Sequence, residues 1–458
     1  MFIYMGKLVA GGGRVGVELI DNKFPTVGLM TSAAWRAFGA SWWPYVMLQT
    51  AMSVAAALML GRAIGRTAGS YARYPAVLFA VVYFNFCPGV FGGFQLETIQ
   101  LFFATIAACA ALDAIESADW RDAFLVGLAG GTAALVKPSG LAVVAAFAVT
   151  TFLVRLREPR AIARHATATL GGLLIPAAAA LAYLHAADLF GVLPGISRQI
   201  SRYAGESSWE LADLLKPVVV LVIGGFPLVV RGLIFRRRKD RVPSPTSGLW
   251  IFAAVWLLIE LAGVVAQRRM YAYHFLVVTP PLAVLFGLLP RTDRLPPLVG
   301  ALVPGMMLSM MSAWTTVEVG RQPGRLEASG YLIAHTEPGD SVWKDEVMRL
   351  LIETDLRPGS RYPMTFLWVN YDEAPIEYCS SMLADFERNR PKYVLLPTEV
   401  ERFITFQSSH IKELGNDPVR KANFTKAWGM LREYVDAHYV AEAVIGRDTV
   451  YRREELAQ

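Results

Sequence analysis

The sequence predicts an α-helical polytopic membrane protein of about ten spans, followed by an extracytoplasmic α/β domain. Hydrophobic residues make up 54% of its 458 residues and charged residues only 18%, whereas soluble domains carry about 25% charged residues. Residues 1–320 hold 26 Lys and Arg against 16 Asp and Glu, and residues 321–458 hold 18 against 22. A basic, apolar block therefore precedes an ordinary soluble composition. Such a basic excess is typical of membrane loops, so we expect no nucleic-acid partner.

The transmembrane domain is predicted at residues 41–320. A helix that crosses the hydrocarbon core needs about 20 apolar residues. The run at 122–136 is short, and Pro138 indicates a tight outer turn into the next run. Ten runs meet or approach the required length: 41–61, 74–92, 96–115, 122–136, 139–156, 167–188, 213–234, 248–266, 272–290 and 295–314.

Lys and Arg in the loops predict the orientation, because cytoplasmic loops are enriched in them. One alternating set of loops contains sixteen Lys and Arg, and the other set contains five. The richer set is predicted to be cytoplasmic. Residues 1–40 are then the first extracytoplasmic loop, and residues 321–458 also lie outside. Preference for Arg over Lys and abundant Ala fit a GC-rich bacterium, so we expect the bacterial inner membrane and its lipids as surroundings. The richer loops are 62–73, 116–121, 155–165, 231–241 and 291–294.

Alternating signals in the tail indicate a small α/β domain. Helices are expected at 325–336, 376–390 and 422–437, and strands at 341–344, 393–397 and 438–445.

Charged side chains on the predicted outer face are the candidates for chemistry, because charges near lipid are costly and usually functional. Each of these charges also has a purely structural explanation. Lys and Arg can extend their charged ends to lipid head groups, and Arg202 can belong to a solvated helix face. Glu97 can stabilise the N-terminus of a helix. Glu260 lies within a span without an evident partner and is read as a packing carboxylate. The outer candidates are Glu18, Asp21, Lys23, Glu97, Lys137, Arg202, Arg268, Arg269 and His274.

Metal and cofactor sites are not predicted. The three cysteines, Cys87, Cys109 and Cys379, have neither a zinc spacing nor a disulfide pattern. Gly11 to Gly16 fits GxGxxG literally, but no βαβ pattern surrounds it.

Four segments resemble the polytopic GT-C glycosyltransferases. The nearest group is that of the dolichyl-phosphate-mannose protein mannosyltransferases and lipid A aminoarabinose transferases. Residues 4–25 are similar to their first outer loop, with DNKFP at 21–25 and Phe24 at the position of a usual proline. The resemblance covers residues 1–320 well and the tail loosely. The other three segments are FQLETIQLFF at 94–103, AALVKPSG at 133–140 and RRMYAYHFLVVTPPLAVLFG at 268–287.

The resemblance implies transfer of a sugar from a polyprenyl-phosphate-linked donor to a lipid, glycan or protein acceptor on the outer face. Asp21, Glu18 and Glu97 would be the catalytic carboxylates. The family also has a span and an acidic motif ahead of the segment that residues 2–4 resemble. We therefore expect either an upstream extension of this chain or a catalytically compromised relative. The donor phosphate would be bound by Lys23, Arg268, Arg269, His274 and Arg202.

Two other functions stay open. A transporter or flippase for a polar or lipid-linked solute would share the many spans, although no repeat relates the two halves. A scaffold that binds a partner through its outer domain would tolerate replacement of Asp21 or Lys23.

Overall fold

The chain forms two compact units in the computed structural model. The model describes residues 2–21, 23–84, 95–205, 247–266, 272–289, 306–307, 310, 327–344, 348–362, 374–410 and 417–454. The helical unit contains Ser41–Ala186 and Trp209–Gln322, and the sheet unit contains Met1–Ala40, Ala187–Ser208 and Pro323–Gln458. The first forty residues thus group with the tail rather than standing alone. Each unit is described by itself below.

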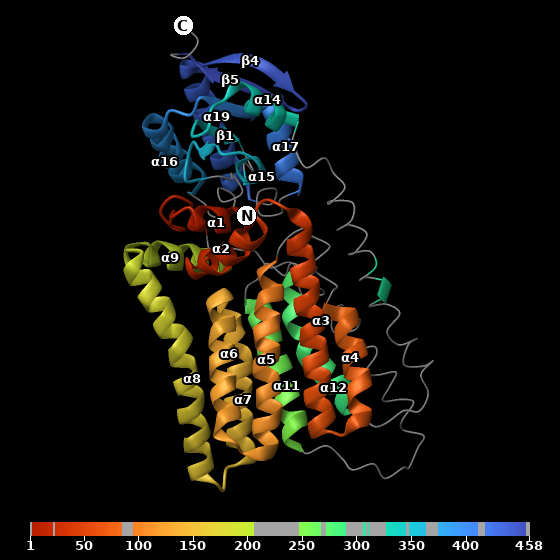
Figure 1. Ribbon diagram of the computed structural model, residues 1–458. Helices are drawn as coiled ribbons and strands as arrows, with labels where there is room; N and C mark the ends of the chain where they lie inside the picture. The colour runs from red at the N-terminus through yellow and green to blue at the C-terminus, as the bar shows by residue number, and fades with distance from the viewer. Residues whose placement is uncertain are drawn as a thin grey trace. The chain divides into compact units, whose positions relative to one another are not determined.

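The helical unit is a bundle of mostly long apolar helices (Figure 1). Lys137 ends one helix, and the short 3₁₀ turn that starts at Pro138 leads into the next, as the sequence predicts. The described elements are α3 (Trp42–Thr67), α4 (Ser70–Phe84), α5 (Leu96–Ser117), α6 (Trp120–Val136), η1 (Pro138–Leu141), α7 (Ala142–Val154), α8 (Pro159–Ala186), α11 (Ser247–Ala266), η3 (Ala272–Val278) and α12 (Thr279–Leu288).

Four described helices are long and apolar enough to cross a membrane: Trp43–Thr67, Leu96–Ser117, Pro159–Ala186 and Ser247–Ala266. Shorter apolar helices occur at Ala72–Tyr83, Pro138–Val154 and His274–Leu288. The predicted span 213–234 lies outside the described residues, as does most of 295–314. A helical membrane protein is therefore supported, whereas the total of ten spans stays a prediction.

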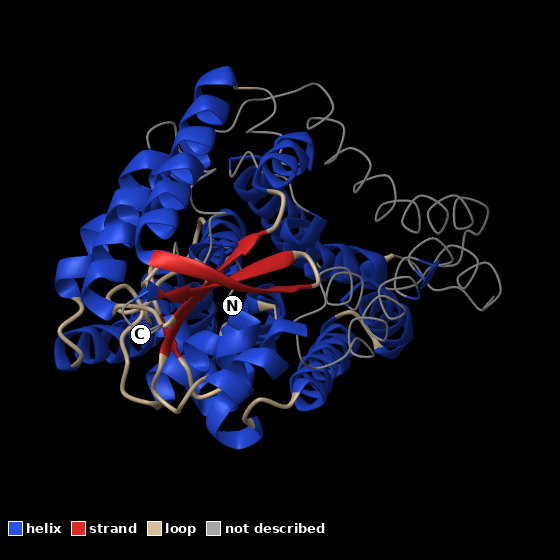
Figure 2. Ribbon diagram, turned by 90° about the horizontal axis from the view of Figure 1, so that it is seen from above, coloured by secondary structure: helices blue, strands red, loops and turns tan. Residues whose placement is uncertain are grey.

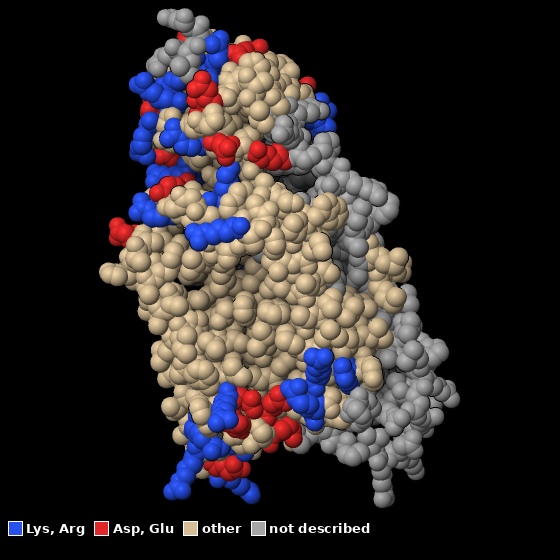
Figure 3. Space-filling view, viewed as in Figure 1, with Lys and Arg blue, Asp and Glu red and all other residues tan. Residues whose placement is uncertain are grey.

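The surface of the helical unit suits a hydrocarbon environment. Helix α8 exposes Leu170, Leu174 and Ile175 by more than half of their surface. Uncharged residues cover the middle of this unit, and charged side chains gather at one end of it (Figure 3). Arg66 near the end of α3 forms an ion pair with Asp113 of α5.

Helices α6 and α8 approach each other closely because glycines line their contact. A Cβ atom added to Gly172 would lie 2.1 Å from the carbonyl oxygen of Phe124. One added to Gly127 would lie 1.9 Å from the carbonyl oxygen of Thr169. Small residues at such crossings let helix backbones pack directly in lipid, where packing replaces the hydrophobic effect.

A five-stranded mixed sheet organises the tail part of the sheet unit (Figure 2). The strand order is β2-β1-β3-β5-β4, parallel from β2 to β3 and antiparallel through β5 and β4. The predicted strands at 341–344, 393–397 and 438–445 are confirmed within one residue. The strands are β1 (Ser341–Lys344), β2 (Arg357–Pro358), β3 (Tyr393–Pro397), β4 (Tyr439–Ile445) and β5 (Asp448–Arg453).

The tail's helices bury their apolar stripes against this sheet. Trp428 on α19 and Phe386 on α16 join Trp343 on β1 in one buried cluster. The predicted helices at 325–336, 376–390 and 422–437 are confirmed with shifts of up to four residues at their ends. The helices of this unit are α1 (Phe2–Ala10), α2 (Thr26–Phe38), η2 (Phe190–Val192), α9 (Leu193–Gly205), α14 (Glu327–His335), α15 (Met348–Glu353), α16 (Ala374–Asn389), α17 (Val400–His410) and α19 (Pro418–His438).

A β-bulge on the edge strand β4 places Glu442 between two paired residues. The Glu442 carboxylate accepts hydrogen bonds from the Tyr331 hydroxyl at 2.5 Å and the Tyr393 hydroxyl at 3.2 Å. It also pairs with Arg452 of β5. An extra residue in a strand re-aims a side chain, and here it ties α14 to three strands.

Candidate functional site

Asp21 and Lys23 form a close ion pair within the sheet unit. The Lys23 ammonium lies 3.6 Å from Oδ1 of Asp21, and the Asp21 side chain is 7% exposed. Within the described residues, no hydrogen bond reaches that oxygen. Buried carboxylate oxygens normally accept hydrogen bonds because desolvation is costly. Asp21 is thus a buried carboxylate next to the Lys23 ammonium, and its Oδ1 can still accept a hydrogen bond.

Glu18 belongs to the same segment but is engaged locally. Its Oε2 accepts the Arg14 backbone N–H at 2.7 Å, and its Oε1 lies 3.4 Å from the Arg14 guanidinium. The Glu18 side chain is 42% exposed. These contacts close a tight turn. Of the two carboxylates predicted in this segment, Glu18 and Asp21, only Asp21 is buried.

The segment carrying Asp21 is held by the tail. The Ile20 backbone N–H donates to the carbonyl oxygen of Arg361 at 2.9 Å. Lys7 on α1 donates to the carbonyl oxygens of Leu351 and Thr354 at 2.7 and 2.5 Å, at the end of α15. Burial lowers the pKa of Lys7, against the opposing attraction of Asp355. Backbone and side-chain contacts on both sides of the turn therefore fix the place of Asp21 on the tail.

Asp385 is a supporting residue that the sequence analysis missed. Its carboxylate is buried and accepts the Ser360 hydroxyl at 3.0 Å and the Arg361 N–H at 3.1 Å. It thereby holds the loop segment whose Arg361 carbonyl accepts the hydrogen bond from Ile20. The signal was an aspartate on the apolar stripe of α16, one turn from Met382 and beside Phe386.

Glu97 and Lys137 form a second ion pair, inside the helical unit. Nζ of Lys137 lies 3.0 Å from Oε1 of Glu97, whose side chain is 7% exposed. Glu97 lies in the first turn of α5, and Lys137 directly follows α6. Next to them along the chain, the Gln100 side-chain amide donates to the Ser139 hydroxyl at 2.9 Å. Polar groups from α5 and the η1 turn thus meet within an apolar bundle.

Glu260 is a further buried carboxylate of this unit, and it has a partner that was not evident from the sequence. The Trp256 indole N–H donates to Oε1 of Glu260 at 3.0 Å, one turn earlier on α11. Glu260 is buried, as the sequence analysis expected of a packing carboxylate. The Trp256–Glu260 pair on α11 and the Glu97–Lys137 pair are thus two polar contacts within the helical unit.

The remaining predicted site residues are described unequally. His274 is buried in η3. Arg202 belongs to α9, and only its place on that helix is described. Arg268 and Arg269 lie outside the described residues. Among the residues that the structure does describe, no group of three or more His, Cys, Asp or Glu is placed to hold a metal ion.

The predicted convergence of all these charges at one site stays a prediction. Asp21, Lys23 and Glu18 belong to the sheet unit, while Glu97 and His274 belong to the helical unit. Each group is a local ion pair in its own right. In comparisons with known proteins, no family model matches the chain, and no curated protein is similar enough to count as a relative.

Proposed function

We propose that this protein is a membrane glycosyltransferase of the bacterial inner membrane. It moves a sugar from a polyprenyl-phosphate-linked donor to an acceptor hydroxyl at the outer face, and the acceptor is a lipid, a glycan or a protein. The donor reaches the enzyme already activated on lipid, so the proposal requires no further cofactor. Both ends of the proposed ten-span helical domain, residues 1–40 and 321–458, lie outside the cytoplasm.

The proposed reaction is a single displacement at the anomeric carbon. The acceptor oxygen attacks that carbon, the bond from the carbon to the phosphate oxygen breaks, and polyprenyl phosphate leaves. The acceptor proton passes to the Asp21 carboxylate, which acts as a general base. The Lys23 ammonium stabilises the charge that develops on the leaving phosphate. The sugar is transferred with inversion.

The observation that carries the proposal is the pairing of the buried Asp21 with the partly exposed Lys23. A carboxylate held 3.6 Å from an ammonium, with an oxygen that accepts no hydrogen bond from any described residue, is costly to maintain. Such a pair has little value for packing, whereas base and phosphate ligand are the two roles that the reaction needs. Its anchorage by Ile20 and Lys7 provides the preorganisation that efficient catalysis requires.

The Glu97–Lys137 ion pair is a separate candidate within the helical unit. We assign Glu97 to orientation of the acceptor, with Lys137 holding its carboxylate in place. Arg268 and Arg269 precede the buried His274 along the chain, and we assign these three residues to the donor phosphate together with Arg202 of α9 and Lys23. Glu18 would assist Asp21 from the neighbouring turn.

The test is a transfer assay with the full-length chain in proteoliposomes. A panel of radiolabelled undecaprenyl-phosphate sugars, including mannose and aminoarabinose, is incubated with extracts of bacterial envelope as acceptors. We expect transfer of one sugar by the wild type. Asp21→Asn removes the base, and Lys23→Ala removes the charge on the leaving group, so each substitution is expected to lower the rate by about 10² to 10³.

Asp436→Asn and Lys426→Ala provide matched controls, because both positions lie on α19 and are exposed. These variants should transfer sugar at the wild-type rate. Wild-type turnover in both Asp21→Asn and Lys23→Ala would refute the site. Absence of donor consumption by the wild type itself would favour a scaffold.

One observation favours a transporter as the second candidate. Glu260 is a buried carboxylate within a candidate span, and intramembrane carboxylates often bind translocated solutes or protons. In the same proteoliposomes a flippase would move fluorescent undecaprenyl-phosphate sugar between leaflets without cleaving it. Glu260→Gln would then abolish movement, whereas Asp21→Asn would leave it intact.

A further inference from the structure

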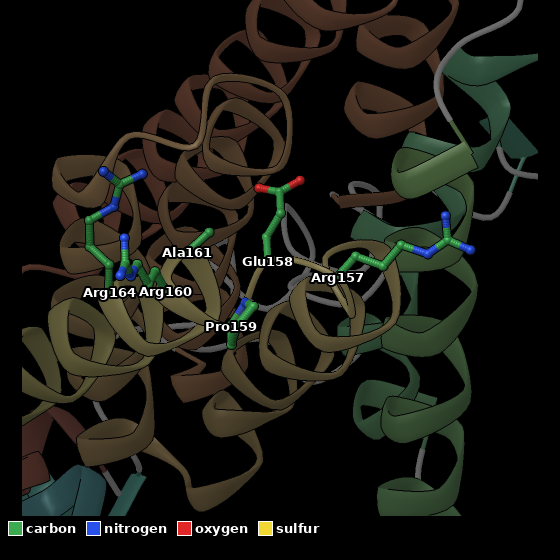
Figure 4. A pocket seen from close by; sticks show the side chains of 6 residues that line it. All are labelled: Arg157, Glu158, Pro159, Arg160, Ala161 and Arg164. Carbon is green, nitrogen blue, oxygen red and sulfur yellow. The ribbon is translucent and has the colours of Figure 1, made fainter.

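An open hollow of about 580 Å³ lies at the turn that joins α7 to α8 in the helical unit. In Figure 4, Arg160 and Arg164 extend to one side of the turn and Arg157 to the other, with Glu158 between them. The sequence analysis assigns this turn to a cytoplasmic loop, and the proposed sugar-transfer site makes no use of it. The hollow is lined by Arg157, Glu158, Pro159, Arg160, Ala161 and Arg164.

The lining carries a positive charge that the fold does not neutralise. The single acid, Glu158, is paired with Arg155 at 3.1 Å. Arg164 donates one hydrogen bond to the carbonyl oxygen of Ala118 at 2.8 Å, which fixes its side chain and leaves its other donors available. Arg157 and Arg160 are exposed, and no ion pair involves either of them within the described part of the chain. Three guanidinium groups therefore border one hollow.

Exposed apolar side chains flank these arginines. Phe152 and Leu153 at the end of α7 are 54% and 47% exposed, and Leu156 in the turn is 56% exposed. On α8, Leu170 and Leu174 are exposed beyond it. Next to water such a surface is unfavourable, whereas acyl chains would cover it. The arginines thus lie at the end of the exposed apolar surface of α7 and α8. In a membrane this position corresponds to the level of the phospholipid head groups.

We propose that this hollow binds the phosphate of an anionic phospholipid from the cytoplasmic leaflet. Guanidinium groups are suited to phosphate because they donate several hydrogen bonds in a planar fork. The neighbouring apolar side chains contact the acyl chains, and this contact distinguishes a lipid from a free phosphate ion. Basic pockets beside membrane helices on the cytoplasmic side commonly hold anionic lipids. The proposal is independent of the proposed transferase activity.

The experiment titrates the full-length chain, in a neutral detergent, with phosphatidylglycerol and follows bound lipid by native mass spectrometry. We expect at least one tightly bound lipid on the wild type. The double variant Arg157→Gln/Arg160→Gln should bind it about 30-fold more weakly, given the contribution of each basic residue to attraction of anionic lipid. Both side chains are exposed, so the variant should fold, and its melting temperature checks this.

Two controls separate the possible outcomes. Arg62→Gln removes an exposed arginine from α3, away from the hollow, and should retain wild-type affinity for the lipid. Inorganic phosphate at the same concentration should not displace the bound lipid. Equal affinities of the wild type and the double variant would overturn the proposal, as would equal weakening by Arg62→Gln. Displacement by phosphate as effectively as by lipid would overturn the assignment to a lipid.

Discussion

Glu442 illustrates how one residue can join several elements of the tail. Partial burial raises the pKa of its carboxyl, but hydrogen bonds from Tyr331 and the pairing with Arg452 outweigh burial, and the pKa lies below its usual value. The charged form is therefore bound more strongly in the folded tail than in the unfolded chain. This stabilisation is present above the ordinary carboxyl pKa of about 4.3 and is lost as the pH falls through the lowered value.

We accordingly expect Glu442→Gln to destabilise the tail at neutral pH and to have less effect in acid. Hydrogen exchange of the amides of β4 and β5, measured in the full-length chain, reports the local free energy of opening. The deficit relative to wild type should shrink between about pH 7 and pH 3.5. Glu433→Gln, an exposed change on α19, should show no deficit. A deficit for Glu442→Gln that is equal at both pH values would contradict the assignment.

At the same scale, the sequence predicted pairs of neighbours better than distant partners. Asp21 and Lys23 are two residues apart, so their ion pair follows from local geometry. Glu97 and Lys137 are forty residues apart, and the sequence could only assign both to one predicted face of the membrane. Asp385 and Glu442 were not predicted as functional residues. Asp385 binds a loop that is distant in sequence, and Glu442 lies at a β-bulge, and neither feature has a periodic sequence pattern.

Among the elements, the α6–α8 contact depends on the absence of side chains. We expect Gly172→Ala to destabilise the helical unit, because its Cβ would lie 2.1 Å from a backbone oxygen of α6 and the helices would have to separate. Overpacking of this kind costs about 1–3 kcal/mol. Thermal melting in detergent, followed by the helical circular dichroism signal, should show a lower midpoint.

Gly171 provides the matched comparison, since it is the adjacent residue of the same helix. A Cβ there would approach only the Phe124 ring, at 3.9 Å, which is ordinary contact. Gly171→Ala should melt at or above the wild-type temperature, because alanine favours the helix by about 0.5–1 kcal/mol. Identical midpoints for the two variants would mean that the helices do not approach as closely as described.

Elements with strong periodicity were predictable, and short ones were not. The apolar run at 96–115 became α5, and the continuous apolar stretch at 393–397 became β3. By contrast, β2 has two residues and α15 has six, too few for either period to appear. Strand β5 was missed because it follows β4 after only two residues, and the sequence there lacks a clear change of pattern.

For the whole molecule, the loop charges predict which parts lie outside the cytoplasm. We expect Lys426→Cys on α19 to react with a membrane-impermeant maleimide in right-side-out vesicles, and Arg62→Cys on α3 to react only after the membrane is opened. Both positions are exposed, so accessibility of the side chain itself is not limiting. The background chain would have Cys87, Cys109 and Cys379 replaced by serine.

The labelling result would be informative in either direction. The reverse pattern would invert the orientation and move the Asp21–Lys23 pair to the cytoplasmic side, which excludes the proposed use of an outer-leaflet donor. Labelling of both positions in intact vesicles would contradict the assignment of 321–458 and 62–73 to opposite faces.

The hydrogen bonds from Lys7 to α15 and from Ile20 to Arg361 join parts of the chain that are more than 300 residues apart. The N-terminal segment emerges from the ribosome first, yet its partners are made only after residues 41–322 have been synthesised. The contacts that anchor the segment carrying Asp21 and Lys23 therefore cannot form before residue 361 has been made. Closure of so long a loop is intrinsically slow. A chain terminated before this point would keep the local ion pair but would lack its anchorage to the tail.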